Sequence, residues 1–266
     1  MTRAEALSKL KASKNFRDIC PSTVERAFVS AFNRYGKPDK ALEAAKERLH
    51  ALTNAFMSEG EAKRARKCLE SYLEGDASAL FEALGCHAST RERLDELDGI
   101  YDRVFALAGT EGGVLDLACG LNPVYLGFRG TGGVRGMDIS GRACAIVNEW
   151  AGACGWDVEA KLDDVNTCAF EGRYRLALCM KLLSVLETDE KGAAERLLER
   201  IPAEYIFVTF PTRSLSGRDV GMEKTYSDRF ESMTKDKFDI LDRFILAREL
   251  CYTIKSKTIQ EAKHDT

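Results

Sequence analysis

The chain has 266 residues, of which 45% are hydrophobic, and its formal net charge is only −3. That length supports a large domain with a smaller one, while the near-zero net charge gives no overall sign of a nucleic-acid partner. No apolar run approaches the roughly 18 residues of a membrane span, and the nine cysteines form no zinc pattern. The lack of a signal peptide predicts a reducing, cytoplasmic setting.

The first 85 residues are predicted to form a helical domain. Ser22 and Glu25 fit a capping box before an amphipathic stretch that Gly36 ends, and a second helical pattern follows it. Two further helical patterns lie within 61–84. Residues 1–80 carry 15 Lys and Arg against 11 Asp and Glu, so this part is mildly basic. We interpret it either as a packing extension or as a module that docks on the substrate.

From residue 86 onward the sequence is predicted to form an α/β domain. Apolar runs of strand length alternate with helical patterns, and such alternation builds a parallel sheet with helices on both faces. The last two runs leave almost no room for a helix between them, so they predict an antiparallel hairpin. The parallel runs are 113–118, 134–139, 157–162, 175–180 and 205–210, and the hairpin runs are 238–244 and 245–252. Five parallel strands and a closing hairpin are the plan of a Rossmann-like S-adenosylmethionine-dependent methyltransferase.

The turn after the first strand, V-L-D-L-A-C-G-L-N-P at 114–123, predicts a site for a cationic ligand. A dinucleotide site would show G-x-G-x-x-G, whereas here only Gly120 is in place and Asp116 would repel a pyrophosphate. A sulfonium compound with a free amino group suits such an acid. Asp138 ends the second strand, where an acid can accept both ribose hydroxyls, and Asp164 follows the third, where it can take an adenine amino group. These acids together predict an S-adenosylmethionine site.

The segment H-A-S-T-R-E-R-L at 87–94 predicts a contact with an anion. Ser89 or Thr90 can cap the helix expected after them, which would put Arg91 and Arg93 in its first turn. Cations in that turn oppose the helix dipole, so helix stability by itself does not explain them. We therefore expect an arginine here to bind the methionine carboxylate of the cofactor.

Two segments bear on the methyl acceptor. After the fourth strand the chain reads M-K-L-L-S-V-L-E, without the [D/N]-P-P-[Y/F] motif of enzymes that methylate exocyclic amines, without an obvious cysteine pair for C5 chemistry, and without a general-base constellation. Guanine N7 needs none of these, because its free lone pair attacks the methyl group directly once aligned. After the fifth strand, the loop 210–226 offers cations and hydroxyls for phosphate contacts, including Arg213, Arg218 and Lys224.

These motifs resemble the aminoglycoside-resistance 16S rRNA (guanine(1405)-N(7))-methyltransferases of the Arm/Rmt type. H-A-S-T-R-E-R-L, L-D-L-A-C-G-L-N-P, M-K-L-L-x-x-L-E and F-P-T-R-S-L-S-G-R all look like that family, in order, over about 87–226. The resemblance implies methylation of guanine N7 in the assembled small ribosomal subunit by a cytoplasmic, monomeric enzyme, with S-adenosylhomocysteine as product. It also implies that residues 1–85 dock on the ribosome and residues 86–266 carry the reaction. Neither a metal nor a catalytic base is expected.

The resemblance also assigns site residues. Two positions depart from the family pattern: Ser184 stands where the family usually has proline, and Asp189 stands at a cofactor position where an amide is expected. The loop between Pro123 and Asp138 is also short. The implied RNA contacts are Lys181, Arg213, Arg218 and Lys224. The implied cofactor residues are Phe56, His87, Ala88, Ser89, Arg93, Ala118, Gly120, Asp138, Ile139, Asp164, Val165, Met180 and Asp189.

Two other functions fit the same sequence. One is a small-molecule methyltransferase on this fold, with the N-terminal helices as a lid, which would be active without ribosomes. The other is an RNA-binding protein that keeps a decayed cofactor site, which would not bind the methyl donor. The motifs favour the rRNA methyltransferase.

Overall fold

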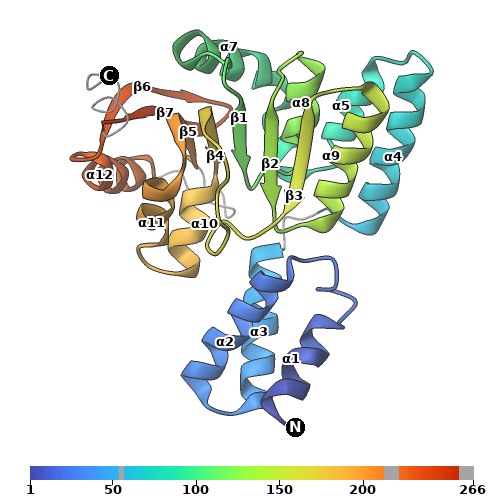
Figure 1. Ribbon diagram of the computed structural model, residues 1–266, viewed down its shortest axis with the longest axis vertical. Coiled ribbons are helices and arrows are strands. Elements are labelled where there is room, and N and C mark those ends of the chain that lie inside the picture. Colours follow the sequence, from blue (N-terminus) through green and yellow to red (C-terminus); the bar gives the residue numbers. More distant parts are fainter. Residues whose placement is uncertain (54–56, 213–221, 258–266) are drawn as a thin grey trace.

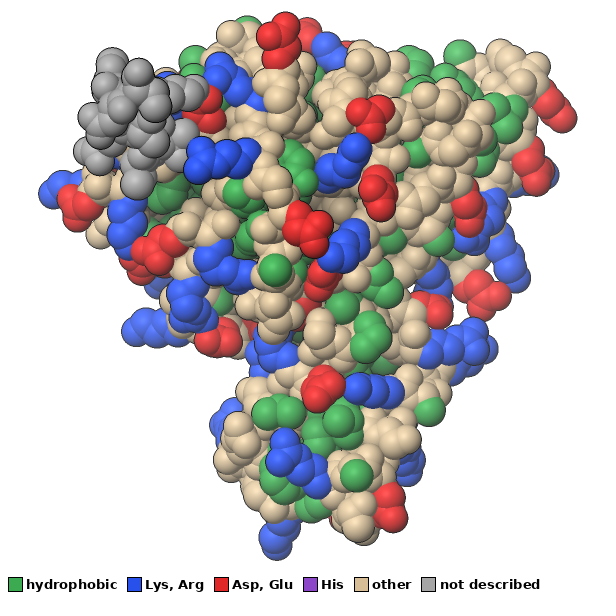
Figure 2. Space-filling model, in the orientation of Figure 1, with side chains coloured by type: hydrophobic (Ala, Val, Ile, Leu, Met, Phe, Trp, Pro, Cys, Tyr) green, Lys and Arg blue, Asp and Glu red, His purple; other side chains and the backbone are tan. Residues whose placement is uncertain are grey.

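The computed structural model of the chain describes residues 1–53, 57–212 and 222–257. Figure 1 shows a large body built around a β-sheet, with a smaller group of helices beneath it. Acidic and basic side chains are mixed over the face shown in Figure 2, in keeping with the near-zero net charge. Within the described ranges, no helix is long and apolar enough to cross a membrane.

One sheet of seven strands, in the order β3-β2-β1-β4-β5-β7-β6, forms the centre of the body. The first five strands pair in parallel, and β7 pairs antiparallel with β5 and β6, so the predicted fold is confirmed. The short central strand β1 is buried at every position, as expected for a parallel strand covered on both faces. The strands are β1 (Val114–Leu117), β2 (Val134–Asp138), β3 (Val158–Leu162), β4 (Tyr174–Met180), β5 (Ala203–Pro211), β6 (Phe238–Leu246) and β7 (Glu249–Ser256).

The hairpin turns three residues later than the sequence pattern indicates, at 247–248 instead of 244–245. Ala247 and Arg248 form the turn, with φ of 50° and 58°. Two successive residues with positive φ are typical of the tight turn whose twist matches that of antiparallel strands. The turn places Glu249 opposite Pro211, at the carboxyl end of β5.

Helices cover both faces of the sheet. On one face lie α7 (Leu97–Ala108), α8 (Asn122–Phe128) and α9 (Gly141–Cys154). Two more helices of the same core pack on these: α4 (Glu59–Leu73) against α9, and α5 (Ser78–Leu84) against α8. The other face packs against α10 (Leu182–Asp189), α11 (Ala193–Arg200) and α12 (Met222–Thr234). Two short pieces, α6 (Ala88–Arg91) and the 3₁₀-helix η1 (Leu94–Glu96), precede α7.

The N-terminal helices α1 (Arg3–Lys11), α2 (Pro21–Tyr35) and α3 (Pro38–Thr53) have a hydrophobic core of their own. We call these three helices the helical unit. The core of the body begins at Met57 and includes α4 and α5. The two cores therefore divide the chain between Leu49 and Met57, whereas the predicted domain boundary lies near residue 85.

The predicted capping box at Ser22 and Glu25 is wrong. Helix α2 starts two residues earlier, at Pro21, and Cys20 occupies the N-cap without a side-chain hydrogen bond. Proline is well suited to the first helical position, because it has no N–H to leave unpaired and its φ is already helical. Pro21 therefore sets the start of the helix.

Candidate functional site

Two strained residues mark the carboxyl ends of the central strands. Ala118, directly after β1, has φ of 56°, and Lys181, directly after β4, has φ of 57°. Non-glycine residues in this conformation cost energy and are held only where surrounding contacts require it. The Lys181 N–H donates to both the carbonyl and the hydroxyl of Thr209 on β5. Chain crossings on either side of β1 and β4 go to opposite faces, so this edge is the switch point where ligands of such sheets bind.

Asp138 is a buried acceptor at this edge. Its Oδ2 accepts from the Gly120 N–H at 2.9 Å, and its Oδ1 accepts from the Ser140 N–H at 2.8 Å. Burial raises the pKa of the carboxyl, and the backbone donors oppose that shift. A carboxylate has about four lone-pair sites, so each oxygen keeps one for a further donor. The side chain therefore fits the predicted role of accepting two ribose hydroxyls.

Gly120 is required by the packing of His87. It has φ of +53°, and a Cβ there would lie 2.3 Å from the His87 ring. His87 Nδ1 is 2.9 Å from the Thr90 hydroxyl. Burial, together with the nearby charges of Arg93 and Arg91, lowers the pKa of His87 to about 4. His87 is therefore a neutral packing residue at pH 7.

A buried polar chain runs behind the turn that follows β1. Asn122 donates to Asp116 Oδ2 at 2.6 Å and accepts from the Tyr101 hydroxyl at 2.6 Å. The same hydroxyl lies 3.6 Å from the Met180 sulfur. Burial raises the pKa of Asp116 to about 8, and a cation bound nearby would favour its ionised form. Sequence reasoning did not assign Tyr101 or Asn122 to the site, although Asn122 lies within the motif at 114–123.

The helix assignment behind the predicted arginine contact needs correction. His87, rather than Ser89 or Thr90, is the N-cap of α6, and that helix ends at Arg91. Arg91 therefore lies in a last turn, where a cation is favourable, and it donates to the Gly85 carbonyl at 3.0 Å. The predicted conflict with the helix dipole does not exist.

Arg93 is nonetheless buried at the carboxyl edge. It donates to the Ser89 hydroxyl at 3.0 Å, and its Nη1 lies 3.5 Å from Glu249 Oε2. The Lys181 ammonium lies 3.2 Å from the other oxygen of Glu249 and also pairs with Glu92. Glu249 thus balances two cations from different segments. Sequence reasoning missed it because it stands at the start of an apolar strand, 156 residues from Arg93.

Asp164 and Asp189 face the helical unit. Asp164 Oδ2 accepts from the Thr23 hydroxyl at 2.8 Å and from two nitrogens of Arg26 at 3.0 and 3.1 Å. Its Oδ1 accepts from the backbone and side chain of Asn166. An adenine amino group would have to compete with these five donors. Asp189 accepts hydrogen bonds from Arg26 and Arg48. A carboxylate binds two arginines more strongly than the amide expected at this position would.

The remaining predicted residues are more scattered. The Ile139 carbonyl accepts from the Cys20 N–H at 2.9 Å, and the Val165 carbonyl accepts from Arg200. Ala88 lies on α6 beside Ser89. The Lys224 side chain, on α12, is 85% exposed. Phe56, Arg213 and Arg218 lie outside the described residues.

The carboxyl edge thus brings together the predicted residues His87, Ser89, Arg93, Ala118, Gly120, Asp138 and Met180. Among the residues that the structure describes, no group of three or more His, Cys, Asp or Glu could hold a metal ion.

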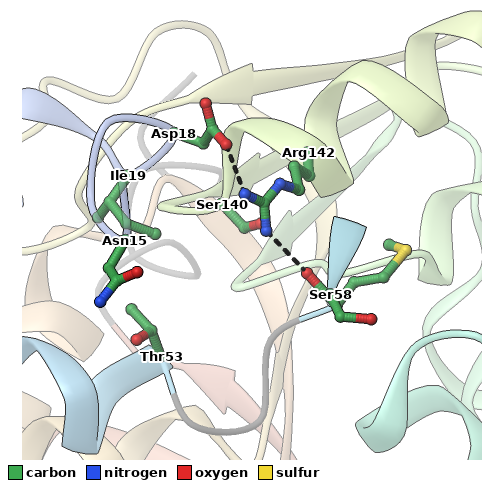
Figure 3. Close-up of a pocket in the computed structure, with 8 residues that line it drawn as sticks. Asn15, Asp18, Ile19, Thr53, Ser58, Ser140 and Arg142 are labelled. Atoms are coloured by element: carbon green, nitrogen blue, oxygen red, sulfur yellow. Dashed lines mark hydrogen bonds and ion pairs between the residues drawn. The ribbon is translucent and has the colours of Figure 1, made fainter. Parts of the chain in front are cut away.

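A small pocket opens where the helical unit meets the start of α9 (Figure 3). It has a volume of about 140 Å³. Arg142 spans it, donating to Asp18 at 2.7 Å and to the Met57 carbonyl at 3.3 Å. Ser140, two residues after Asp138, is part of its wall. The lining residues are Asn15, Asp18, Ile19, Thr53, Met57, Ser58, Ser140 and Arg142.

Comparison with known proteins extends the similarity over almost the whole chain. The model of a family described as ribosomal RNA methyltransferase (FmrO) matches residues 12–253. A Serratia marcescens protein named 16S rRNA (guanine(1405)-N(7))-methyltransferase is 39% identical, over 94% of this chain and 97% of its own length. One of the same name from Micromonospora echinospora is 30% identical, over 91% and 93%. The crystal structure of the 16S rRNA methyltransferase RmtF in complex with S-adenosyl-L-homocysteine has a TM-score of 0.89 and 45% identity, over 96% of this chain and 98% of that one.

Proposed function

Because this chain belongs to the FmrO family of ribosomal RNA methyltransferases, we propose that it transfers the methyl group of S-adenosylmethionine to N7 of guanine 1405 in 16S rRNA. The observation that carries the proposal is the similarity, over 94% of the chain, to a protein of that name. A methyl group on N7 blocks hydrogen bonding by an aminoglycoside to that base, so the enzyme confers resistance to such drugs.

The residues at the carboxyl edge support a methyl-donor site. Asp138 keeps two lone pairs for the ribose hydroxyls, and Asp116 lies buried behind the turn where a cationic amino group would be favourable. Ser89 on α6 and Arg93, directly before η1, would bind the methionine carboxylate. When bound, S-adenosylmethionine supplies an electrophilic methyl group on a sulfonium. The protein residues bind and orient it.

No residue is assigned as a base. Guanine N7 carries a lone pair and no proton, so the acceptor needs only alignment with the methyl group and exclusion of water. His87 is neutral and packs against Gly120 and the Thr90 hydroxyl. This packing explains its place in the motif without a role in proton transfer.

We assign the assembled small subunit as the substrate and the helical unit as its docking surface. Figure 2 shows Lys and Arg side chains spread over this unit, where contacts to phosphates would position the enzyme. Lys181 at the carboxyl edge and Lys224 on α12 are the described residues assigned to RNA. The enzyme would act as a monomer in the cytoplasm, where ribosomes are found.

The departure at Ser184 is compatible with this function. Its hydroxyl donates to the Lys181 carbonyl at 3.2 Å, in the first turn of α10. The serine therefore stabilises the start of the helix where the family usually has proline.

Primer extension on 16S rRNA from bacteria that express the chain tests the proposal. We expect a modified guanine at 1405 and high resistance to 4,6-disubstituted aminoglycosides, with little change toward other aminoglycosides. Expression of the Asp138→Asn variant is the matched control. Unmodified rRNA from cells that contain folded wild-type protein would refute the function, and methylation of small molecules without ribosomes would favour the alternative enzyme class.

A further inference from the structure

Four charged side chains join the helical unit to the carboxyl edge of the sheet. Arg26 on α2 reaches both Asp164, after β3, and Asp189, at the end of α10, at 3.0 and 2.7 Å. Arg48 on α3 pairs with Asp189 and also reaches its carbonyl at 3.4 Å. In Figure 1 the helical unit lies below the sheet, beside α10. The two arginines therefore bridge elements that are about 140 residues apart in sequence.

These ion pairs differ from ordinary surface pairs in their burial. The side chains of Asp164 and Asp189 are 1% and 4% exposed, and those of Arg26 and Arg48 are 19% and 22% exposed. Burial by itself would raise the pKa of Asp189, but hydrogen bonds from Arg48 and Arg26 outweigh it and hold the pKa below its ordinary value. Removing either arginine would leave a buried charge with less compensation.

A second attachment lies next to Asp138. The Cys20 N–H donates to the Ile139 carbonyl at 2.9 Å, and the Gly141 N–H donates to the Asp18 carbonyl at 2.8 Å. The segment before α2 thus pairs with the turn that follows β2, as if it were a short additional strand. The helical unit contacts the carboxyl ends of β2 and β3 and the end of α10 at the same time.

We propose that Arg26 and Arg48 are positioning residues of the methyl-donor site, which make the helical unit one wall of that site as well as a docking surface. The identity of the donor rests on the proposed function. By fixing Asp164 and Asp189, the arginines set where the β3 loop and the end of α10 stand relative to Asp138. An unpaired helical unit would leave the adenosine side of the site without a fixed wall.

Both carboxylates are already engaged by the arginines. Both oxygens of Asp164 and both oxygens of Asp189 already accept hydrogen bonds. The cluster therefore joins the helical unit to the body through both carboxylates, since Arg26 donates to each of them. Its geometry is that of a clamp between two parts of the chain.

Binding of S-adenosylhomocysteine to the full-length variants Arg26→Gln and Arg48→Gln, measured by calorimetry, tests this inference. A matched control is Arg66→Gln, because Arg66 makes a bidentate pair with Glu149 that joins α4 to α9 within the body. We expect the first two variants to bind roughly tenfold to 100-fold more weakly, since small displacements around a site have effects of that size. The control should bind like wild type, and Arg48→Lys, which keeps the charge, should recover part of the affinity.

Two further readouts separate positioning from a general loss of stability. Steady-state kinetics should show a raised KM for S-adenosylmethionine with kcat little changed at saturating donor. Hydrogen exchange of the ligand-free variants should speed up at the backbone amides of 139–141 and 164–165. Variants that are less stable but bind S-adenosylhomocysteine with wild-type affinity would overturn the proposal.

The inference and the proposed function fail in different ways. Wild-type protein that binds S-adenosylhomocysteine but leaves 16S rRNA unmodified would refute the proposed function. The affinities of Arg26→Gln and Arg48→Gln for S-adenosylhomocysteine would then still decide the positioning role. Modified rRNA in cells with the wild-type protein, together with unchanged ligand affinity in Arg26→Gln and Arg48→Gln, would refute the positioning role and support the proposed function. Wild-type protein without affinity for S-adenosylhomocysteine would remove both.

Discussion

Replacing Asp138 tests the donor site most directly, because each of its carboxylate oxygens has one lone pair used by the backbone and one left for the ligand. Each oxygen already accepts one backbone N–H, from Gly120 or Ser140. A hydrogen bond from a hydroxyl to a charged carboxylate contributes about 1.5–3 kcal/mol. Two ribose hydroxyls would therefore contribute about 3–6 kcal/mol, and Asp138→Ala should weaken S-adenosylhomocysteine roughly 10²- to 10⁴-fold.

Asp138→Asn is the more informative variant. Alanine would leave two buried N–H groups without an acceptor, at about 1–3 kcal/mol each, so instability would confuse the result. Asparagine keeps one acceptor oxygen. It also removes a buried carboxyl whose pKa is raised by burial, so the desolvation cost of the charge disappears and part of the loss in stability is offset. It should lose about one charge-assisted hydrogen bond to the ligand, which is roughly tenfold to 150-fold in affinity.

Asp157→Asn provides the matched control for calorimetry. Asp157 also accepts a backbone N–H, from Gly133 at 2.8 Å, and a side-chain donor, from Arg135 at 2.9 Å. It lies at the opposite end of the sheet with a 63% exposed side chain, so its replacement should leave ligand affinity unchanged. Folded Asp138→Asn protein with wild-type affinity would refute the ribose assignment.

Three further predictions concern stability, each measured by denaturant unfolding. Gly120→Ala should lower the free energy of unfolding by about 1–3 kcal/mol or more, because φ is +53° and the new Cβ would displace His87; an unchanged midpoint would contradict this packing. Arg93→Ala should cost about 3–5 kcal/mol by leaving Glu249 buried beside a single cation, and the double variant Arg93→Met with Glu249→Gln should cost less; equal losses would argue against a coupled pair. The lowered pKa of Asp189 means that its contribution is complete above an unfolded pKa of about 3.9 and is lost as the pH falls through the folded value. Asp189→Asn should therefore be less stable than wild type at pH 7, with a difference that disappears in acid; a difference independent of pH would refute the sign.

The arrangement of the sheet could be predicted because its signals are local. A buried parallel strand such as β1 must be apolar over its length, and the turn after it must contain residues that allow a sharp change of direction. Asp138 could be placed in the same way, since the carboxyl ends of neighbouring parallel strands meet at one edge. These inferences need only the order of elements along the chain.

The helical segments were predicted less completely. An amphipathic pattern shows that α4 and α5 have an apolar face, but it does not show which core that face joins. In the structure these helices pack on the body, with Arg66 of α4 paired to Glu149 of α9. The boundary between cores therefore follows tertiary packing and lies earlier than the boundary suggested by the change from helices to strands.

The amino-acid sequence by itself determined the class of fold, the edge of the sheet where we propose the site, and the motifs that identify the family. The tertiary structure alone decided which charges meet there. Glu249 reaches Arg93, and Arg26 and Arg48 reach Asp164 and Asp189, across 138 to 163 residues of chain. Such pairs leave no periodic pattern in the sequence, because their partners are brought together by the packing of whole elements and their strength comes from the burial that packing creates.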